Sequence, residues 1–166
     1  MDELSFENIV NLHYEPLYRF ALTLSRSEAD ACDLTQQTFY RWATKGGQLR
    51  DKSKVKPWLF TTLHREFLGQ RRHEDKFQKM EISVVDESEL AANSPLPEKQ
   101  IDGASVMEVL QTLAETYRAP LALFYLEDNS YRDIAEILDV PIGTVMSRIA
   151  RGKDLLRKII FEKETR

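Results

Sequence analysis

Basic side chains gather in two segments of the sequence, and phosphate binding is the chemistry that such clusters favour. Residues 144–158 carry five basic side chains and one acidic, and residues 50–80 carry nine basic and four acidic. The whole chain of 166 residues nevertheless has a formal net charge of −4, partly because residues 81–102 carry six acidic side chains and one basic. A solvated helix face is the alternative explanation of either basic segment taken alone.

Other kinds of chemistry find little support among the residue types. The sequence has no glycine-rich phosphate loop, and the three histidines, His13, His64 and His73, do not combine with Cys32 at the spacing of metal ligands. No Ser-His-Asp arrangement can be argued either. We therefore expect a protein that is not an enzyme and that has no catalytic residue, no metal and no cofactor.

The composition indicates the cellular compartment and limits the number of domains. Cys32 is the single cysteine, so an internal disulfide is impossible and a reducing cytoplasm is favoured. No apolar run approaches the roughly 18 residues of a membrane span, and no basic region precedes an apolar stretch at the N-terminus. We expect a cytoplasmic protein without a membrane span, long enough for one ordinary domain or two small ones.

The N-terminal part of the chain, from residue 5 to about 72, has the apolar spacing of helices. Ser27 predicts a helix start, and Gly46-Gly47 predicts the end of that helix. Residues 52–56 are expected to form a short basic loop, after which Pro57 suits the first turn of another helix. Trp58 is expected to anchor the core of that part.

Residues 75–102 differ in character from both flanking parts. They are acidic and rich in turn formers, and Pro95 and Pro97 exclude a continuing helix. We therefore predict a domain over residues 1–74, a flexible acidic linker over 75–104, and a second domain over 105–166.

The C-terminal part is again helical in pattern. Ser105 and Ser130 each precede an acidic residue by three positions, as in a capping box. A helix is expected near Tyr117 to Glu127 with Pro120 in or near its first turn. Thr144 is expected to cap the last helix, in which Gly152 costs about 1 kcal/mol relative to alanine without an evident reason.

Residues 130–158 form a helix, a tight turn and a second, basic helix, which is the helix-turn-helix arrangement. In such a unit the second helix enters the major groove. Helical geometry places Met146, Ser147, Ala150 and Arg151 away from the apolar stripe of Val145 and Ile149. Arg151 can bridge the acceptors of a guanine or hold a phosphate, and Lys153, like other cations of this helix, is expected near phosphates or solvent. An ordinary helical hairpin is the alternative.

Two separate stretches of the chain resemble bacterial sigma factors of the extracytoplasmic-function group. Residues 130–138 and 141–152 resemble the DNA-reading domain of that group, and residues 14–21 and 33–42, with Trp58-Leu59 and Arg71-Arg72, resemble its first conserved domain. The resemblance implies an all-α protein of two small helical domains, a region 2-like domain and a region 4-like helix-turn-helix domain, joined by the linker.

The resemblance also implies partners and a division of labour. Core RNA polymerase would be bound through the clamp helices of its largest subunit and the flap of its second-largest subunit, and an anti-sigma factor is a further partner known for the group. The residues implied in clamp binding are Asp33, Gln36, Gln37, Phe39 and Tyr40. Those implied at the minus-ten promoter element are Lys52, Lys54, Lys56, Phe60, His64, Arg65, Arg71 and Arg72. Those implied at the minus-thirty-five element are Thr144, Met146, Ser147, Arg148, Ala150 and Arg151.

The sequence departs from the pattern of the group at two places. Met146 stands where a basic residue is frequent, which favours apolar contact with a thymine methyl group. His64-Arg65-Glu66 and Gly69 replace a frequent Ala-Arg-Asn and Asp, so contacts to the minus-ten strand do not transfer directly. A conventional helix-turn-helix regulator that binds duplex DNA without polymerase is the main alternative function, and a helical protein-interaction module is another.

Overall fold

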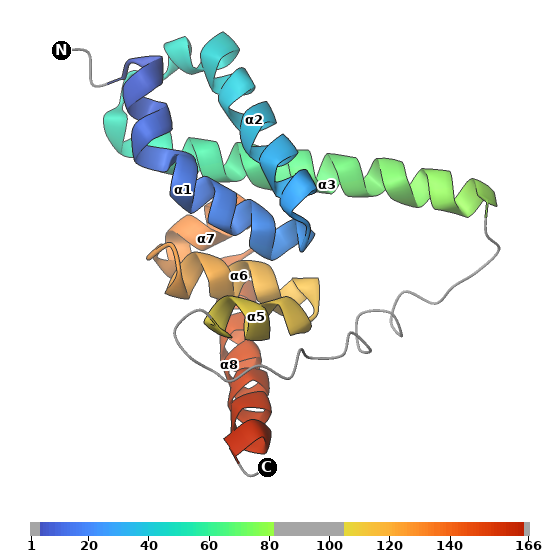
Figure 1. The fold of residues 1–166 in the computed structure, drawn as a ribbon. Helices are drawn as coiled ribbons and strands as arrows, with labels where there is room; N and C mark the ends of the chain where they lie inside the picture. Colours follow the sequence, from blue (N-terminus) through green and yellow to red (C-terminus); the bar gives the residue numbers. More distant parts are fainter. Residues whose placement is uncertain (1–3, 82–104, 165–166) are drawn as a thin grey trace.

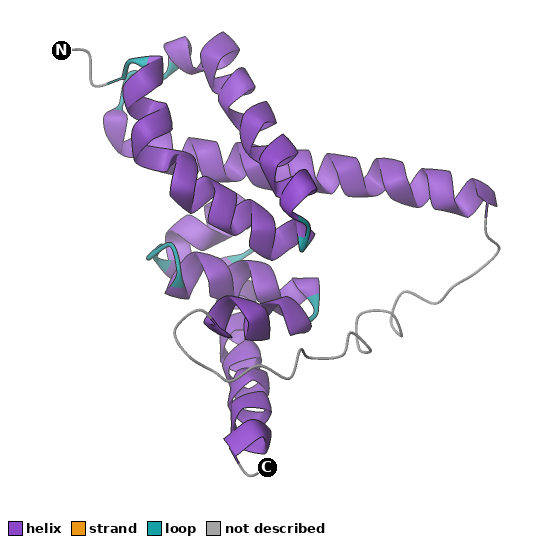
Figure 2. Ribbon diagram, viewed as in Figure 1, coloured by secondary structure: helices purple, strands orange, loops and turns teal. Residues whose placement is uncertain are grey.

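The computed structural model describes residues 4–81 and 105–164. Within these two ranges every regular element is a helix (Figure 2), which confirms the all-α prediction. The helices fall into an N-terminal bundle, α1 to α3, and a C-terminal bundle, α5 to α8 (Figure 1). None of the described helices is both long enough and apolar enough to cross a bilayer. The acidic segment predicted as a linker lies, from residue 82 on, outside the described residues.

The N-terminal bundle consists of α1 (Phe6–Ser25), α2 (Glu28–Lys45) and α3 (Val55–Glu81). The predicted start at Ser27 is confirmed, because the Ser27 hydroxyl accepts a hydrogen bond from the Asp30 amide at 3.3 Å. The three helices bury an apolar core in which Phe20 of α1 lies against Phe60 of α3, with ring centroids 5.5 Å apart. This burial fixes how α3 is rotated about its own axis.

Two short 3₁₀ helices connect α2 to α3, over Gly46–Gln48 and Lys52–Lys54. Gly46 ends α2 as predicted, and a Cβ atom there would lie 2.4 Å from the Trp42 ring, so only glycine lets the chain pass the indole. The expected basic loop is shorter than predicted, because α3 already begins at Val55 and takes up Lys56. Pro57 lies in the first turn of α3, as predicted.

Helix α3 continues to Glu81, past the predicted domain boundary at residue 74. No glycine or proline occurs between Arg72 and Glu81, so nothing in the local sequence interrupts the helix there. Its C-terminal half projects beyond the other helices (Figure 1). The proposed boundaries of the two domains remain predictions.

The C-terminal bundle consists of α5 (Ser105–Thr112), α6 (Glu115–Tyr125), α7 (Tyr131–Leu138) and α8 (Ile142–Glu164). The capping box of α7 is confirmed: the Ser130 hydroxyl accepts from the Asp133 amide at 3.1 Å, and the Asp133 carboxylate accepts from the Ser130 amide. Asp139 ends α7 in the left-handed conformation, with φ of 55°. The described residues do not include the side chain of Ser105.

Two boundaries of the C-terminal bundle differ from prediction. Helix α6 begins at Glu115 rather than near Tyr117, so Pro120 lies inside the helix, where it is buried. Helix α8 begins at Ile142, and the Thr144 amide already donates to the Pro141 carbonyl at 3.0 Å. Thr144 is therefore an internal residue of the first turn and not the cap.

Gly152 has a packing role that the sequence left open. A Cβ atom at this position of α8 would lie 2.6 Å from Leu121 Cδ1 and 3.4 Å from Tyr117 Cβ on α6. The missing side chain thus lets α8 approach α6 closely, which offsets the intrinsic cost of glycine within a helix.

The two bundles pack against each other in this structure. Helices α1 and α3 lie against α5, α6 and α7, while α8 projects away on the far side (Figure 1). Apolar side chains of both bundles belong to one continuous buried cluster, and polar contacts surround it. The first helix of the helix-turn-helix, α7, packs directly on α3.

Candidate nucleic-acid interface

The N-terminal half of α8 presents a face of four side chains to solvent, and we call these residues the recognition face: Met146, Ser147, Ala150 and Arg151. Met146 is 51% exposed, although Val145 and Ile149 beside it are buried in the core. The predicted orientation of the helix is therefore confirmed. The Ser147 hydroxyl donates to the Thr144 carbonyl at 3.2 Å, which leaves its oxygen lone pairs directed to solvent.

Lys153 of α8 belongs to a different environment from the recognition face. Its Nζ lies 5.8 Å from the centroid of Phe124 and 5.6 Å from that of Tyr125, both on α6. A hydrogen bond with Tyr125 raises the pKa of Lys153 above its ordinary value. Sequence reasoning expected a residue near phosphate or solvent, but Lys153 also ties α8 to α6 through these rings.

A groove of about 680 Å³ lies between α2 and α3. Arg65 of α3 is exposed at its wall, and Trp58 forms part of its surface while packing edge-on against Trp42 at 5.3 Å between centroids. The anchor predicted at Trp58 is thus only partly buried. Single-stranded nucleic acid binds to surfaces of this kind, because the cations neutralise its phosphates and its bases stack on aromatic side chains.

Sequence reasoning missed two cations of this groove, Arg41 and Lys45. Both are exposed on α2 and stand four residues apart, so they share one helix face. That spacing is visible in the sequence and could have identified them. Arg41 forms an ion pair with Glu66 of α3, which joins the two walls of the groove.

Two of the predicted minus-ten residues are corrected by their burial. Phe60 is fully buried against Phe20, so its ring cannot stack on a base. His64 is only 9% exposed, and burial, helped by Arg65, lowers its pKa to about 4. It is therefore neutral near pH 7 and supplies no charge to a phosphate. Both residues lie on the face of α3 that packs inward.

The remaining predicted minus-ten residues fall into two sets. Lys52, Lys54 and Arg72 are exposed, like Arg65. Lys56 and Arg71 contact the C-terminal bundle: half-buried Lys56 donates from Nζ to the Glu127 carbonyl at 2.7 Å, and Arg71, although exposed, forms an ion pair with Glu115. The surface predicted to bind the minus-ten element is therefore partly occupied by the other bundle.

A second cavity, of about 540 Å³, lies between the two bundles. His64 and Arg71 of α3 line it on one side, and Leu138 of α7 and Arg148 of α8 line it on the other. Arg148 is half-buried there, unlike the four residues of the recognition face. A residue predicted at the minus-thirty-five element thus lies beside residues predicted at the minus-ten element.

The polymerase-binding residues predicted on α2 are mostly accessible. Asp33, Gln36, Gln37 and Tyr40 are exposed, and the Asp33 carboxylate accepts a hydrogen bond from Gln70 Nε2 at 2.9 Å. Phe39 is the exception, because it is buried and stacks on Tyr14 with centroids 6.2 Å apart. Phe39 therefore packs beneath the exposed face of α2 and is not part of it, which corrects its predicted role as a direct contact with polymerase.

In the described part of the chain, no group of three His, Cys, Asp or Glu side chains is arranged to hold a metal ion. The geometry assembled on α2, α3 and α8 consists instead of exposed cations and polar groups on helical faces. Such faces bind phosphate backbones and base edges.

Comparison with known families agrees with this geometry. The family model for sigma-70 region 2 matches residues 9–77, and that for sigma-70 region 4 matches residues 104–156. The chain is 34% identical to the ECF RNA polymerase sigma factor SigE of Mycolicibacterium smegmatis, over 92% of this chain and 60% of that protein. It is 26% identical to SigW of Bacillus subtilis, over 95% of this chain and 89% of SigW.

A solved structure resembles both bundles together. It is the co-crystal structure of the sigma factor RpoE with the anti-sigma factor NepR from Bartonella quintana. The TM-score is 0.76 at 30% sequence identity, with 93% of this chain and 96% of that chain covered.

The helical fold, the two matched regions and these relatives define a class: the chain belongs to the sigma-70 family, within its extracytoplasmic-function group. It is a sigma factor, a protein that directs promoter recognition with RNA polymerase. A regulator that works on duplex DNA alone is not favoured.

Proposed function

We propose that this sigma factor reads the minus-thirty-five promoter element with the recognition face of α8. The observation that carries the proposal is the exposure of the four residues of the recognition face immediately after a capped helix and a tight turn. Arg151 has the donor geometry for guanine, and Met146 supplies apolar contact for a thymine methyl group. Thr144 and Arg148 are proposed to contact the adjacent phosphates.

The minus-ten element is proposed to bind along the groove between α2 and α3. Arg65 lines this groove, and Lys52, Lys54 and Arg72 are exposed elsewhere on the N-terminal bundle. These cations can neutralise the phosphates of a separated strand. Lys56 and Arg71 are proposed to join them once they are released from the C-terminal bundle. Arg41 and Lys45 extend the same basic surface onto α2.

Core RNA polymerase is proposed to bind the exposed face of α2. Asp33, Gln36, Gln37 and Tyr40 supply a carboxylate, two amides and a ring for the clamp helices of the largest subunit. The C-terminal bundle is proposed to bind the flap of the second-largest subunit. An anti-sigma factor is a further proposed partner, which is supported by the likeness to a sigma factor solved with one.

The proposed role is non-enzymatic and cytoplasmic. Sigma factors are generally DNA-binding regulators without catalytic activity, and binding to core polymerase and promoter DNA requires access to the bacterial cytoplasm. The chain's own residues would therefore position DNA and polymerase, and the chemistry of RNA synthesis would belong to the polymerase.

Transcription in vitro tests the proposal. Purified core polymerase is given a library of random promoter sequences with and without this protein, and the transcripts are sequenced. We expect start sites that depend on the protein and share two upstream motifs. Duplex binding by the protein alone, with no association with core polymerase, would contradict the proposal and favour a conventional regulator.

A further inference from the structure

The cavity between the two bundles has the size of a small-molecule site. Its volume is about 540 Å³, and ligand pockets in proteins usually measure about 300 to 1,000 Å³. Its walls come from four helices, α3, α6, α7 and α8. It is separate from the groove between α2 and α3, with which it shares no lining residue. What the cavity can hold depends on the side chains that line it.

Two guanidinium groups reach this cavity. Arg148 of α8 is half-buried there, and no described residue forms an ion pair or a hydrogen bond with its side chain. Arg71 of α3 is exposed at the cavity and forms an ion pair with Glu115 of α6. Glu115 is the one carboxylate among the described residues that line the cavity, so two positive charges share a single negative charge. The cavity therefore favours an anion, and guanidinium groups bind phosphate oxygens through paired hydrogen bonds.

A third guanidinium group strengthens the positive potential beside the cavity. Arg118 of α6 stands next to the lining residue Ala119, is 6% exposed, and leaves its Nε without a hydrogen-bond partner among the described residues. Burial, and then the charges of Arg26 and Arg71, lower the pKa of Arg118 to about 10, so it is still protonated at pH 7. These side chains lie close enough to repel one another. An anion held by Arg71 would offset this repulsion.

His64 of α3 supplies an uncharged hydrogen-bond donor to the same cavity. It is 9% exposed, and no described residue forms a hydrogen bond with its imidazole. Because burial lowers its pKa to about 4, the imidazole is neutral at pH 7 and carries one N–H group that can donate to a phosphate oxygen. A buried polar group without a partner costs free energy, which a bound ligand would recover.

The first turn of α6 also lines the cavity. Its N-cap residue, Ala114, provides no side-chain hydrogen bond to the amides that follow. Helix N-termini attract anions through such amides and through the helix dipole. This contribution adds to those of the two guanidinium groups and of His64. The polar part of the lining therefore suits a ligand with several anionic oxygens, as phosphates have.

Much of the remaining lining is apolar. It includes Leu68 of α3, Ala119 and Pro120 of α6, and Leu138 of α7. An inorganic ion would leave this surface without a partner, whereas a sugar or base ring would pack on it. A ligand that uses both parts of the lining combines phosphate groups with an uncharged ring system, and a nucleotide has this composition.

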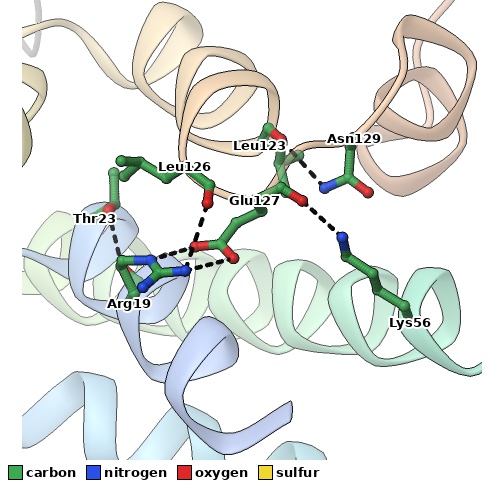
Figure 3. Close-up of polar contacts among 7 residues, drawn as sticks. All are labelled: Arg19, Thr23, Lys56, Leu123, Leu126, Glu127 and Asn129. Carbon is green, nitrogen blue, oxygen red and sulfur yellow. Dashed lines mark hydrogen bonds and ion pairs between the residues drawn. The ribbon is translucent and has the colours of Figure 1, made fainter. Parts of the chain in front are cut away.

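Contacts between the bundles hold the walls of the cavity in place. Glu127, in the segment between α6 and α7, is 4% exposed and accepts two hydrogen bonds from Arg19 of α1, with Nε to Oε1 at 2.7 Å and Nη2 to Oε2 at 3.1 Å (Figure 3). The Glu127 carbonyl accepts from Lys56 Nζ of α3 at 2.7 Å (Figure 3). These contacts fix α6 and α7 relative to α3, and all three helices line the cavity. A preformed site loses less conformational entropy when its ligand binds.

We propose that the cavity between the two bundles binds a small organic phosphate of nucleotide size. Arg148 and Arg71 hold the phosphate groups, His64 donates to a phosphate oxygen, and the sugar or base ring packs on the apolar part of the lining. Glu115 competes with the ligand for Arg71. The site does not rest on the proposed contacts with promoter DNA, because the free protein forms it.

Isothermal titration calorimetry of the full chain, without DNA or polymerase, tests the site. The probes are the 5′-diphosphates of adenosine, guanosine, cytidine and uridine, together with ribose 5-phosphate. Adenosine and inorganic pyrophosphate are the reference compounds, because each supplies only one part of the ligand. We expect at least one probe to bind roughly tenfold more tightly than either reference compound. If a nucleoside diphosphate binds most tightly the site takes a nucleotide, and if ribose 5-phosphate does it takes a sugar phosphate.

Removing a cation from the cavity should weaken this binding. We expect Arg148→Gln to lower the affinity for the tightest probe by roughly tenfold, the loss expected for a charge-assisted hydrogen bond. Arg157→Gln is the matched control, because it removes the same charge from the same helix at a side chain that is 79% exposed. It should leave the affinity unchanged.

Removing the carboxylate should have the opposite effect. We expect Glu115→Gln to raise the affinity by roughly threefold, because Arg71 loses a competing partner of the strength of a surface ion pair. A gain in affinity cannot come from a loss of folded protein, so this variant keeps the test decisive if Arg148→Gln does not fold. Glu136→Gln removes the same charge from an exposed position on α7 and should not change the affinity.

The proposal is overturned if no probe binds more tightly than adenosine and pyrophosphate, or if Arg148→Gln and Glu115→Gln bind the tightest probe as their controls do. None of these measurements involves promoter-specific transcription. Failure of the proposed function is therefore distinguishable, because it appears as absent transcription with core polymerase, whatever the calorimetry shows.

Discussion

The two basic surfaces of the molecule differ in how much the rest of the chain covers them. The recognition face of α8 is open, with its four side chains exposed on a bundle edge. On α3, Arg65 and Arg72 are open, but Lys56 and Arg71 contact the other bundle and His64 is buried. An edge helix can present its face as soon as it folds. A helix that is also central to packing presents only what its neighbours leave accessible.

The largest expected effect comes from disrupting the close packing of α8 on α6. Gly152→Val places a branched side chain where even a Cβ would lie 2.6 Å from Leu121. We expect the free energy of unfolding to fall by about 3 kcal/mol, at the upper end for overpacking. Thermal unfolding measures this, and Gly143→Ala is the control, because an added Cβ there meets nothing within 4 Å. Equal stability of the two variants would contradict the close approach of α6 and α8.

The next largest effect is the pH dependence of the free energy of unfolding, which tests the burial of His64 on α3. The pKa of His64 is lowered from 6.5 to about 4 by burial, so the unfolded chain takes up the proton first as pH falls. Stability should therefore be unaffected well above pH 6.5 and should fall by roughly 2 kcal/mol between pH 7 and pH 5 on account of this residue. His64→Gln should reduce that slope in denaturant unfolding, whereas His73→Gln, an exposed position, should retain it. An unchanged slope in His64→Gln would mean that His64 is solvated.

The open surface of α8 is tested by removing its most specific donor. Arg151→Ala should weaken binding of the holoenzyme to a selected promoter by about tenfold, within the range of a lost guanine contact. Arg151→Lys keeps the charge but loses the bidentate geometry, so it should weaken binding nearly as much if Arg151 reads a base. If Arg151→Lys binds like the unmutated protein, Arg151 contacts a phosphate only. Loss of core polymerase binding would contradict the proposed role of α8.

The smallest expected effect concerns the exposed cations beside α3. Lys54→Ala should weaken single-stranded DNA binding only a few-fold and should reduce the slope of log affinity against log salt by about 0.7, the value for one phosphate on a single strand. The measurement is fluorescence anisotropy at several salt concentrations. Arg132→Ala, an exposed cation on α7, is the control and should leave the slope unchanged. If Lys54→Ala leaves this slope unchanged, Lys54 does not contact a phosphate at the minus-ten surface.

Local signals in the sequence predicted much of the architecture. Ser27 and Ser130 act through hydrogen bonds that span three residues, so their caps follow from neighbouring residues alone. The recognition face follows from the 3.6-residue period, because Val145 and Ile149 fix which side of α8 is buried. The helix starts near Pro120 and Thr144 differ from prediction, because helix boundaries depend on packing as well as on caps.

Properties that depend on distant residues could not be predicted in this way. Phe60 and His64 share one face of α3 with the apolar Leu63 and Phe67, but helical spacing does not show which distant residues cover that face, here Phe20 and the C-terminal bundle. The reason for Gly152 lies on α6, at Leu121. The contact between Arg19 and Glu127 joins residues 108 positions apart and leaves no pattern in a single sequence.

The distance between the two bundles in the working complex tests the account most directly. With labels on Cys32 and on the cysteine of Asp154→Cys, energy transfer is measured for the free protein, after addition of core polymerase, and after addition of promoter DNA. We predict high transfer in the free protein and low transfer in the promoter complex, as two separated DNA-binding surfaces require. Low transfer in the free protein, or high transfer retained in a transcribing complex, would contradict it.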